Sequence, residues 1–81
     1  MWRDDATLLD ILTAARLALQ FRGQLDKASF LTDLKTQAAV LHELLVLGEA
    51  AKRLSIGFRD EHQDVPWKAM AGMRDRLLHG Y

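Results

Sequence analysis

The chain has one proline in 81 residues, and the position of this residue, Pro66, constrains the fold more than any other feature. Proline fits the first turn of a helix, because its φ angle is already helical and its missing N–H group would have no partner there. Apolar residues make up 49% of the chain, mostly as leucine and alanine, and this composition favours helices over sheet. The sequence therefore predicts an all-α chain whose last helix begins at Pro66 and closes at Gly80.

A first helix is predicted before Gly23, where a glycine is typical of a helix end. Asp4 or Asp5 is placed to cap this helix, since its N-terminal dipole favours their charge. Arg16 and Arg22 are expected in solvent. The face predicted to be buried is a stripe of apolar residues at helical spacing: Leu8, Ile11, Leu12, Ala15 and Leu19.

A long helical region is predicted over residues 28–54, capped by Asp26 and bent near Thr32 and Asp33. Its apolar positions cover a wide arc, which is typical of a helix with more than one neighbour. Few neighbours are available in one domain (residues 1–81) with about three long helices and a short one capped by Ser55. We therefore expect the extra neighbour to be a second copy, in a homodimer.

Composition excludes several classes of protein. Eleven basic and eleven acidic residues give zero net charge, so any nucleic-acid binding must depend on a local patch. No cysteine is present, which fits the cytoplasm and excludes disulfides. No apolar run reaches the roughly 18 residues of a membrane span. No glycine-rich phosphate loop, metal-ligand spacing of histidines or tight acidic cluster occurs, so no cofactor and no metal is predicted.

Arg74 stands on the apolar face of the predicted last helix. At about 100° per residue it points the same way as Trp67, Met70, Leu77, Leu78 and Tyr81. Guanidinium groups are rarely buried without a partner, so this face meets either an acid on another helix or an anion in a cleft. Glu49 is the candidate acid. It either pairs with Arg74 or lies with His42 on a polar flank of the core.

The pattern Arg74-Asp75-x-x-x-His79-x-Tyr81 resembles a family signature. It is similar to the R-x4-6-H motif of the HEPN superfamily of helical ribonucleases, and closer to the R-x4-H-x-Y form of HepT-like toxins. Residues 48–55, 65–67 and 71–74 are similar to stretches of that family in the same order. The resemblance implies a HEPN-like antiparallel helical bundle and a metal-independent endoribonuclease toxin that acts on RNA. It also implies a cognate nucleotidyltransferase antitoxin.

Arg74 and His79 are the minimal pair for metal-free RNA cleavage. The ribose 2′-OH is an internal nucleophile, and histidine supplies an acid or base that titrates near neutral pH. Arginine supplies a fixed positive charge for the oxygens of the phosphorane. On an ideal helix, however, five residues turn about 140°, so the two side chains do not share a face. Either the helix unwinds before Gly80, or two subunits build a composite site.

The resemblance implies two further roles. Tyr81 matches a tyrosine that the antitoxin AMPylates, and a nucleotide there would block substrate phosphate beside Arg74 and His79; the other interpretation is that Tyr81 packs on the stripe of Trp67. Asp75 matches a polar position of the family, where it either orients Arg74 or His79 or lies in solvent.

Two other hypotheses remain open. The chain is either a non-catalytic helical module that binds a nucleotide or an acidic partner through Arg74 and His79, or an inactive fragment. The second arises because the resembled family continues past the tyrosine into another helix, which we expect this chain to lack.

Overall fold

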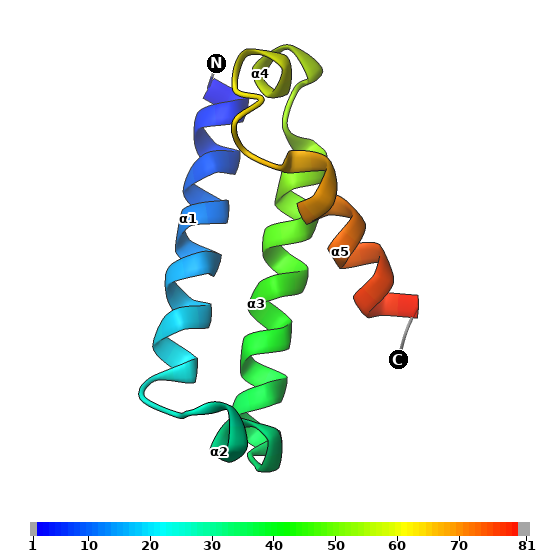
Figure 1. Cartoon of the computed structure of the whole chain (residues 1–81). Coiled ribbons are helices and arrows are strands. Elements are labelled where there is room, and N and C mark those ends of the chain that lie inside the picture. The colour runs from blue at the N-terminus through cyan, green and yellow to red at the C-terminus, as the bar shows by residue number, and fades with distance from the viewer. Residues whose placement is uncertain (1, 80–81) are drawn as a thin grey trace.

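The computed structural model describes residues 2–79, and helices joined by short turns are the only regular secondary structure in this range. The helices are α1 (Trp2–Arg22), α2 (Lys27–Thr32), α3 (Leu34–Arg53), α4 (Ile56–Glu61) and α5 (Trp67–His79). The long helices α1 and α3 run antiparallel, and α5 packs on another side of α3 (Figure 1). The short helices α2 and α4 lie at opposite ends of this pair, where the chain reverses (Figure 1). The predicted all-α helical bundle is confirmed.

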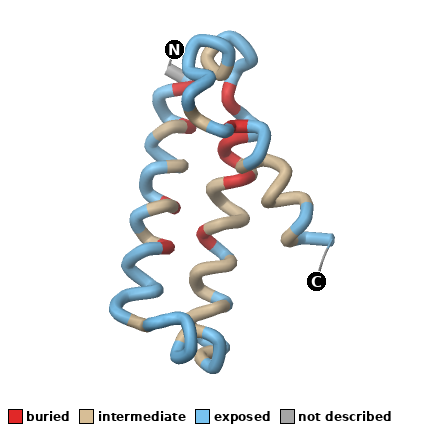
Figure 2. Tube along the Cα trace, in the orientation of Figure 1, coloured by how far each residue is buried: buried red, intermediate tan, exposed pale blue. Residues whose placement is uncertain are grey.

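Small side chains form the contact between α1 and α3. Ala14 on α1 is 1% exposed, and Ala50 and Ala51 on α3 are fully buried. Small residues at a helix contact allow the two axes to approach closely. The buried positions gather toward the α4 end of the molecule, where Leu54 and Trp67 join them (Figure 2).

The face of α1 that packs on α3 differs from the predicted stripe. Asp4, Thr7, Ala14 and Ala18 are buried, at spacings that also fit one side of a helix. Leu12 and Leu19 of the predicted stripe are exposed, and its other members are at most half-buried. The prediction was wrong because the close contact with the alanines of α3 accepts small side chains, so the leucines turn to the edge of the contact.

Side-chain caps separate the helices where the sequence predicts. The carboxylate of Asp26 accepts a hydrogen bond from Ser29 N–H at 2.8 Å, and the hydroxyl of Ser55 accepts one from Phe58 N–H at 3.1 Å. The bend expected near Asp33 is a complete break, because Asp33 caps α3 by accepting from Thr36 N–H at 3.0 Å.

Asp4 binds the start of α4 rather than capping α1, and Asp5 is exposed. The backbone N–H and the hydroxyl of Ser55 both donate to Asp4, at 2.9 and 2.7 Å. The predicted cap was therefore wrong, because α1 already begins at Trp2, but both acids do lie in its first turn, where the helix dipole favours their charge. Asp4 lies on the face of α1 that meets the junction between α3 and α4, and its carboxylate ties the N-terminal turn to that junction.

The last helix begins one residue after the predicted start. Its first residue is Trp67, and the carbonyl of Pro66 accepts its first hydrogen bond, from Met70 N–H at 3.0 Å. Gly80 and Tyr81 lie outside the described residues. Among the helices of residues 2–79, none combines the length and apolar character needed to cross a bilayer.

Candidate active site

Helices α3 and α5 approach each other most closely at Gly48. A methyl group added at Gly48 would overlap Cβ of Arg74 and would lie 3.1 Å from the carbonyl oxygen of Met70. Only a residue without a side chain allows α5 to cross α3 at this distance. Gly48 therefore places the stem of Arg74 directly against α3.

Arg74 is held by acids on both helices. Its Nε lies 3.0 Å from Glu49 Oε2, and its Nη1 donates to Asp75 Oδ1 at 3.2 Å. The side chain of Arg74 is 27% exposed, so the guanidinium group is partly withdrawn from water. Of the two alternatives for Glu49, the structure has the ion pair with Arg74.

Lys52 completes this charge cluster, which we name the α3–α5 cluster and which consists of Glu49, Lys52, Arg74 and Asp75. Lys52 Nζ donates to Asp75 Oδ1 at 3.0 Å. Hydrogen bonds from Lys52 and then from Arg74 lower the pKa of Asp75 below its ordinary value. Lys52 was not predicted from the sequence as part of this site. Its spacing of three residues from Glu49 puts both on one face of α3, which is the signal that could have found it.

The guanidinium group of Arg74 keeps donors for a ligand. It has five N–H groups, and the contacts with Glu49 and Asp75 involve only Nε and Nη1. Within residues 2–79 its other N–H groups have no partner. A planar fork with free donors suits a phosphate oxygen.

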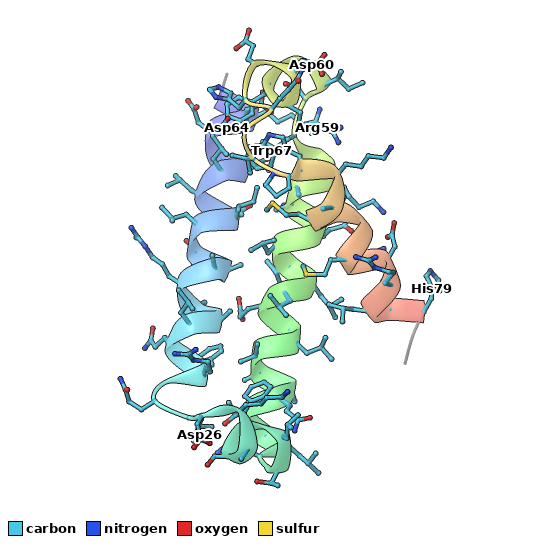
Figure 3. All side chains as sticks on the ribbon, in the orientation of Figure 1. Asp26, Arg59, Asp60, Asp64, Trp67 and His79 are labelled. Carbon is cyan, nitrogen blue, oxygen red and sulfur yellow. The ribbon has the colours of Figure 1, made fainter. Side chains whose placement is uncertain are left out.

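His79 lies apart from Arg74. It is the last residue of α5, is exposed, and points away from α3 (Figure 3). The helix continues through His79, so it does not unwind within the described residues to turn the imidazole toward Arg74. At about 100° per residue the two side chains remain about 140° apart on α5. Within residues 2–79 no side chain forms a hydrogen bond or ion pair with His79.

The other candidate residues lie outside the α3–α5 cluster or outside the described residues. His42 is exposed and lies 3.8 Å from Glu43, away from the α3–α5 cluster. The part of the chain that the structure describes holds no group of three His, Cys, Asp or Glu side chains arranged around a possible metal ion. Tyr81, the predicted regulatory residue, lies outside the described residues, so its position is not part of the site geometry.

Comparison with known proteins decides the family. Residues 11–81, which include the whole α3–α5 cluster and His79, match the family model described as ribonuclease HepT-like. The chain belongs to the HepT-like family. The HEPN-superfamily resemblance that the sequence suggested through Arg74 and His79 is therefore confirmed.

Several curated relatives support this membership in the HepT-like family. A protein named probable ribonuclease HepT, from Thermococcus cleftensis, is 42% identical over 74 residues, which cover 91% of this chain and 67% of the relative. Two proteins of Methanocaldococcus jannaschii, whose names give them as candidate RNases, are 43% and 36% identical over 76 residues each. The matches cover 94% of this chain, and 63% and 70% of those relatives. The chain thus spans about two thirds of the length of the HepT-like relatives it matches. No solved structure matches it.

Proposed function

We propose that this chain is a metal-independent endoribonuclease and acts as the toxin of a toxin–antitoxin pair in the cytoplasm. Membership in the HepT-like family and the names of the relatives support the ribonuclease activity. The position of Arg74 is the main structural support for this activity. Gly48 and Glu49 hold its guanidinium group in place, and part of its set of N–H donors stays free. A positioned cation with free donors is what the transition state of phosphoryl transfer needs.

In the proposed reaction the ribose 2′-oxygen attacks the adjacent phosphorus, and the bond from phosphorus to the 5′-oxygen breaks. His79 exchanges protons with these oxygens, because an imidazole titrates close to neutral pH. Arg74 stabilises the negative charge that builds on the non-bridging oxygens. Glu49 and Asp75 act as positioning residues, since their contacts keep the guanidinium group oriented before the substrate arrives.

We propose a composite site in a homodimer. Arg74 and His79 diverge on an unbroken α5, so one subunit does not direct both side chains at one phosphate. Two copies facing each other across a two-fold axis would place Arg74 of one subunit opposite His79 of the other. Leu78 on α5, next to His79 in the sequence, is an exposed large apolar residue and is consistent with a surface that a second subunit covers.

The proposed regulation acts at Tyr81. A cognate nucleotidyltransferase antitoxin would attach AMP to this residue, two positions after His79. The added nucleotide brings bulk and negative charge to the site, and both oppose the binding of a substrate phosphate. This part of the proposal derives from the family resemblance of the motif.

The test is cleavage of RNA by the purified chain in EDTA, with Arg74→Ala and His79→Ala compared with the parent. Each substitution is expected to lower kcat by about 100-fold or more, the range for losing a transition-state donor or a general acid–base. Arg53→Ala is the matched control, because Arg53 pairs with Asp10 across α1 and α3 and lies outside the proposed site. Cleavage that requires an added divalent ion, or that survives Arg74→Ala, would contradict the mechanism.

One observation favours a second candidate function, a non-catalytic binding module. The two cations and two acids of the α3–α5 cluster cancel in charge, as in a structural network. In that case Arg74→Ala should lower the free energy of unfolding, and neither the parent nor the variant should cleave RNA above background. A chain that folds but neither cleaves RNA nor responds to Arg74→Ala would be the inactive fragment.

A further inference from the structure

A basic surface lies on the side of α5 opposite the α3–α5 cluster. A groove of about 1180 Å³ runs between α4 and α5, and the cations Arg59, Lys68 and Arg76 line it against a single acid, Asp60. Arg59 and Asp60 lie on α4, next to the start of α5 (Figure 3). We name this surface the α4–α5 groove. Its excess of positive charge contrasts with the zero net charge of the chain.

The α5 wall of the groove is one face of the helix. Lys68, Gly72 and Arg76 follow each other at intervals of four residues, so they lie in a row. Nothing lies within 4 Å of a methyl group added at Gly72, so the backbone of α5 is open to the groove at this point. A ligand lying in the groove can therefore approach the helix closely between the two cations.

The cations of the groove are not neutralised by the protein. Within residues 2–79 neither Lys68 nor Arg76 forms an ion pair, whereas Lys52 and Arg74 on the other side of α5 both do. Nε of Arg59 is buried and has no hydrogen-bond partner in the described part of the chain. Buried N–H groups are normally paired, because an unpaired one costs free energy. Arg59 also forms no ion pair in the described part of the chain, so its charge adds to that of Lys68 and Arg76 along the groove.

We propose that the α4–α5 groove binds the phosphate backbone of an RNA strand and directs that strand to His79. The inference rests on the proposed ribonuclease function and adds a substrate-binding surface to it. Lys68 and Arg76 are about 12 Å apart along α5 at 1.5 Å per residue, a span that fits a polymer of phosphates better than a single anion. His79 is about one further turn along nearly the same face, three residues after Arg76.

The groove contacts the backbone of the strand and not its bases. Trp67 is the one aromatic residue that lines it, and this side chain is 8% exposed with its ring N–H donating to the carbonyl of His62 at 2.9 Å. Base recognition by single-strand binders uses exposed aromatic faces on which bases stack. Binding in this groove is therefore expected to depend on salt and to be independent of base sequence.

The probe is a fluorescently labelled 2′-O-methyl RNA strand, which lacks the nucleophilic hydroxyl and cannot be cleaved. Its affinity is measured by fluorescence anisotropy at several salt concentrations. Lys68→Glu, Arg76→Glu and Gly72→Glu are each expected to weaken binding at least about 10-fold. The slope of log affinity against log salt is expected to fall by about 0.7 for each phosphate that the variant no longer neutralises. Arg16→Glu and Lys35→Glu make the same charge change at exposed positions outside the groove, and Gly72→Ala adds no charge.

Equal losses of affinity in the groove variants and in Arg16→Glu and Lys35→Glu would overturn the proposal, as would binding that no groove variant weakens. Polyglutamate and unlabelled RNA are then compared as competitors at equal concentrations of negative charge. If polyglutamate displaces the labelled strand as effectively as RNA does, the proposal is overturned and the groove is a protein-binding surface. A parent that binds the strand through the groove without cleaving RNA would refute the ribonuclease function and support the groove. A parent that cleaves RNA at a rate that no groove variant changes would support the ribonuclease function and refute the role of the groove.

Discussion

Gly48 determines the position of Arg74 although it has no side chain of its own. A glycine inside a helix costs stability relative to alanine, so its presence in the middle of α3 needs a structural reason. The reason is the crossing of α5, whose Arg74 stem occupies the space of a Cβ atom at Gly48. The sequence could predict that Arg74 needs an acid, because a cation on an apolar face needs a partner. It could not predict the crossing point, which depends on how two helices meet.

Gly48→Ala and Gly72→Ala are the same chemical change with opposite expected results. At position 48 the added methyl group overlaps Arg74, so α3 and α5 must separate, and we expect a loss of about 1–3 kcal/mol in the free energy of unfolding. At position 72 the methyl group meets nothing, and the gain in helix propensity is expected to stabilise the protein by up to about 1 kcal/mol. Urea unfolding followed by circular dichroism measures both. Equal effects at the two positions would contradict the close crossing.

Asp4 makes stability depend on pH. Hydrogen bonds from the backbone N–H and then the hydroxyl of Ser55 lower the pKa of Asp4 below its ordinary value of 3.8. A carboxyl group with a lowered pKa in the folded state stabilises that state at pH values above its unfolded pKa. This contribution disappears as the pH falls through the lowered folded pKa.

The variant Asp4→Asn is therefore expected to be less stable than the parent at pH 7 and to approach it as the pH falls below about 3.8. Thermal unfolding between pH 2 and pH 7 gives the comparison. Asp5→Asn removes the same charge at the neighbouring exposed position, and we expect a smaller effect that lacks this convergence. A stability difference between parent and Asp4→Asn that is constant with pH would contradict the Asp4–Ser55 contact.

At the scale of helices, the features that sequence predicted are those with local causes. The caps at Asp26 and Ser55 and the helix that follows Pro66 each depend on a few neighbouring residues, and so does the interruption near Asp33, which was predicted as a bend and is a break. The face of α1 has a different cause. Two faces of α1 fit helical spacing, and the alanines of α3 select the one with small residues, which brings Asp4 into the core. Hydrophobic periodicity alone does not determine which of the two faces of α1 packs on α3.

The corrected orientation of α1 can be tested with Ala14→Leu and Leu9→Ala. Ala14 is 1% exposed at the contact with α3, so a leucine there would overpack the contact and cost about 1–3 kcal/mol. Leu9 is 63% exposed, and its truncation is expected to change the free energy of unfolding of the dilute monomer by less than about 0.5 kcal/mol. Chemical denaturation at low protein concentration provides both values. A larger cost for Leu9→Ala than for Ala14→Leu would contradict the observed face.

At the scale of the whole molecule, the α3–α5 cluster and the α4–α5 groove lie on opposite sides of one helix. Neither Lys52 nor the groove was predicted from the sequence, because both depend on which elements pack beside α5. The separation of Arg74 from His79 was predictable, since it follows from helical geometry, and α5 retains that geometry through His79. In the proposed mechanism, two surfaces on opposite sides of α5 take part in one reaction because a second copy of the chain brings them together.

Mixing two inactive variants tests this arrangement. If Arg74 of one subunit acts with His79 of its partner, a dimer of one Arg74→Ala and one His79→Ala chain contains one site with both substitutions and one intact site. Random mixing makes half of the dimers mixed, so cleavage is expected to recover to about a quarter of the parent rate. If both residues act within one subunit, every site in the mixture carries one substitution and no activity returns. Chains are unfolded and refolded together before the assay, and Arg74→Ala mixed with the double variant Arg74→Ala/His79→Ala is the control, because that mixture has no intact site under either arrangement.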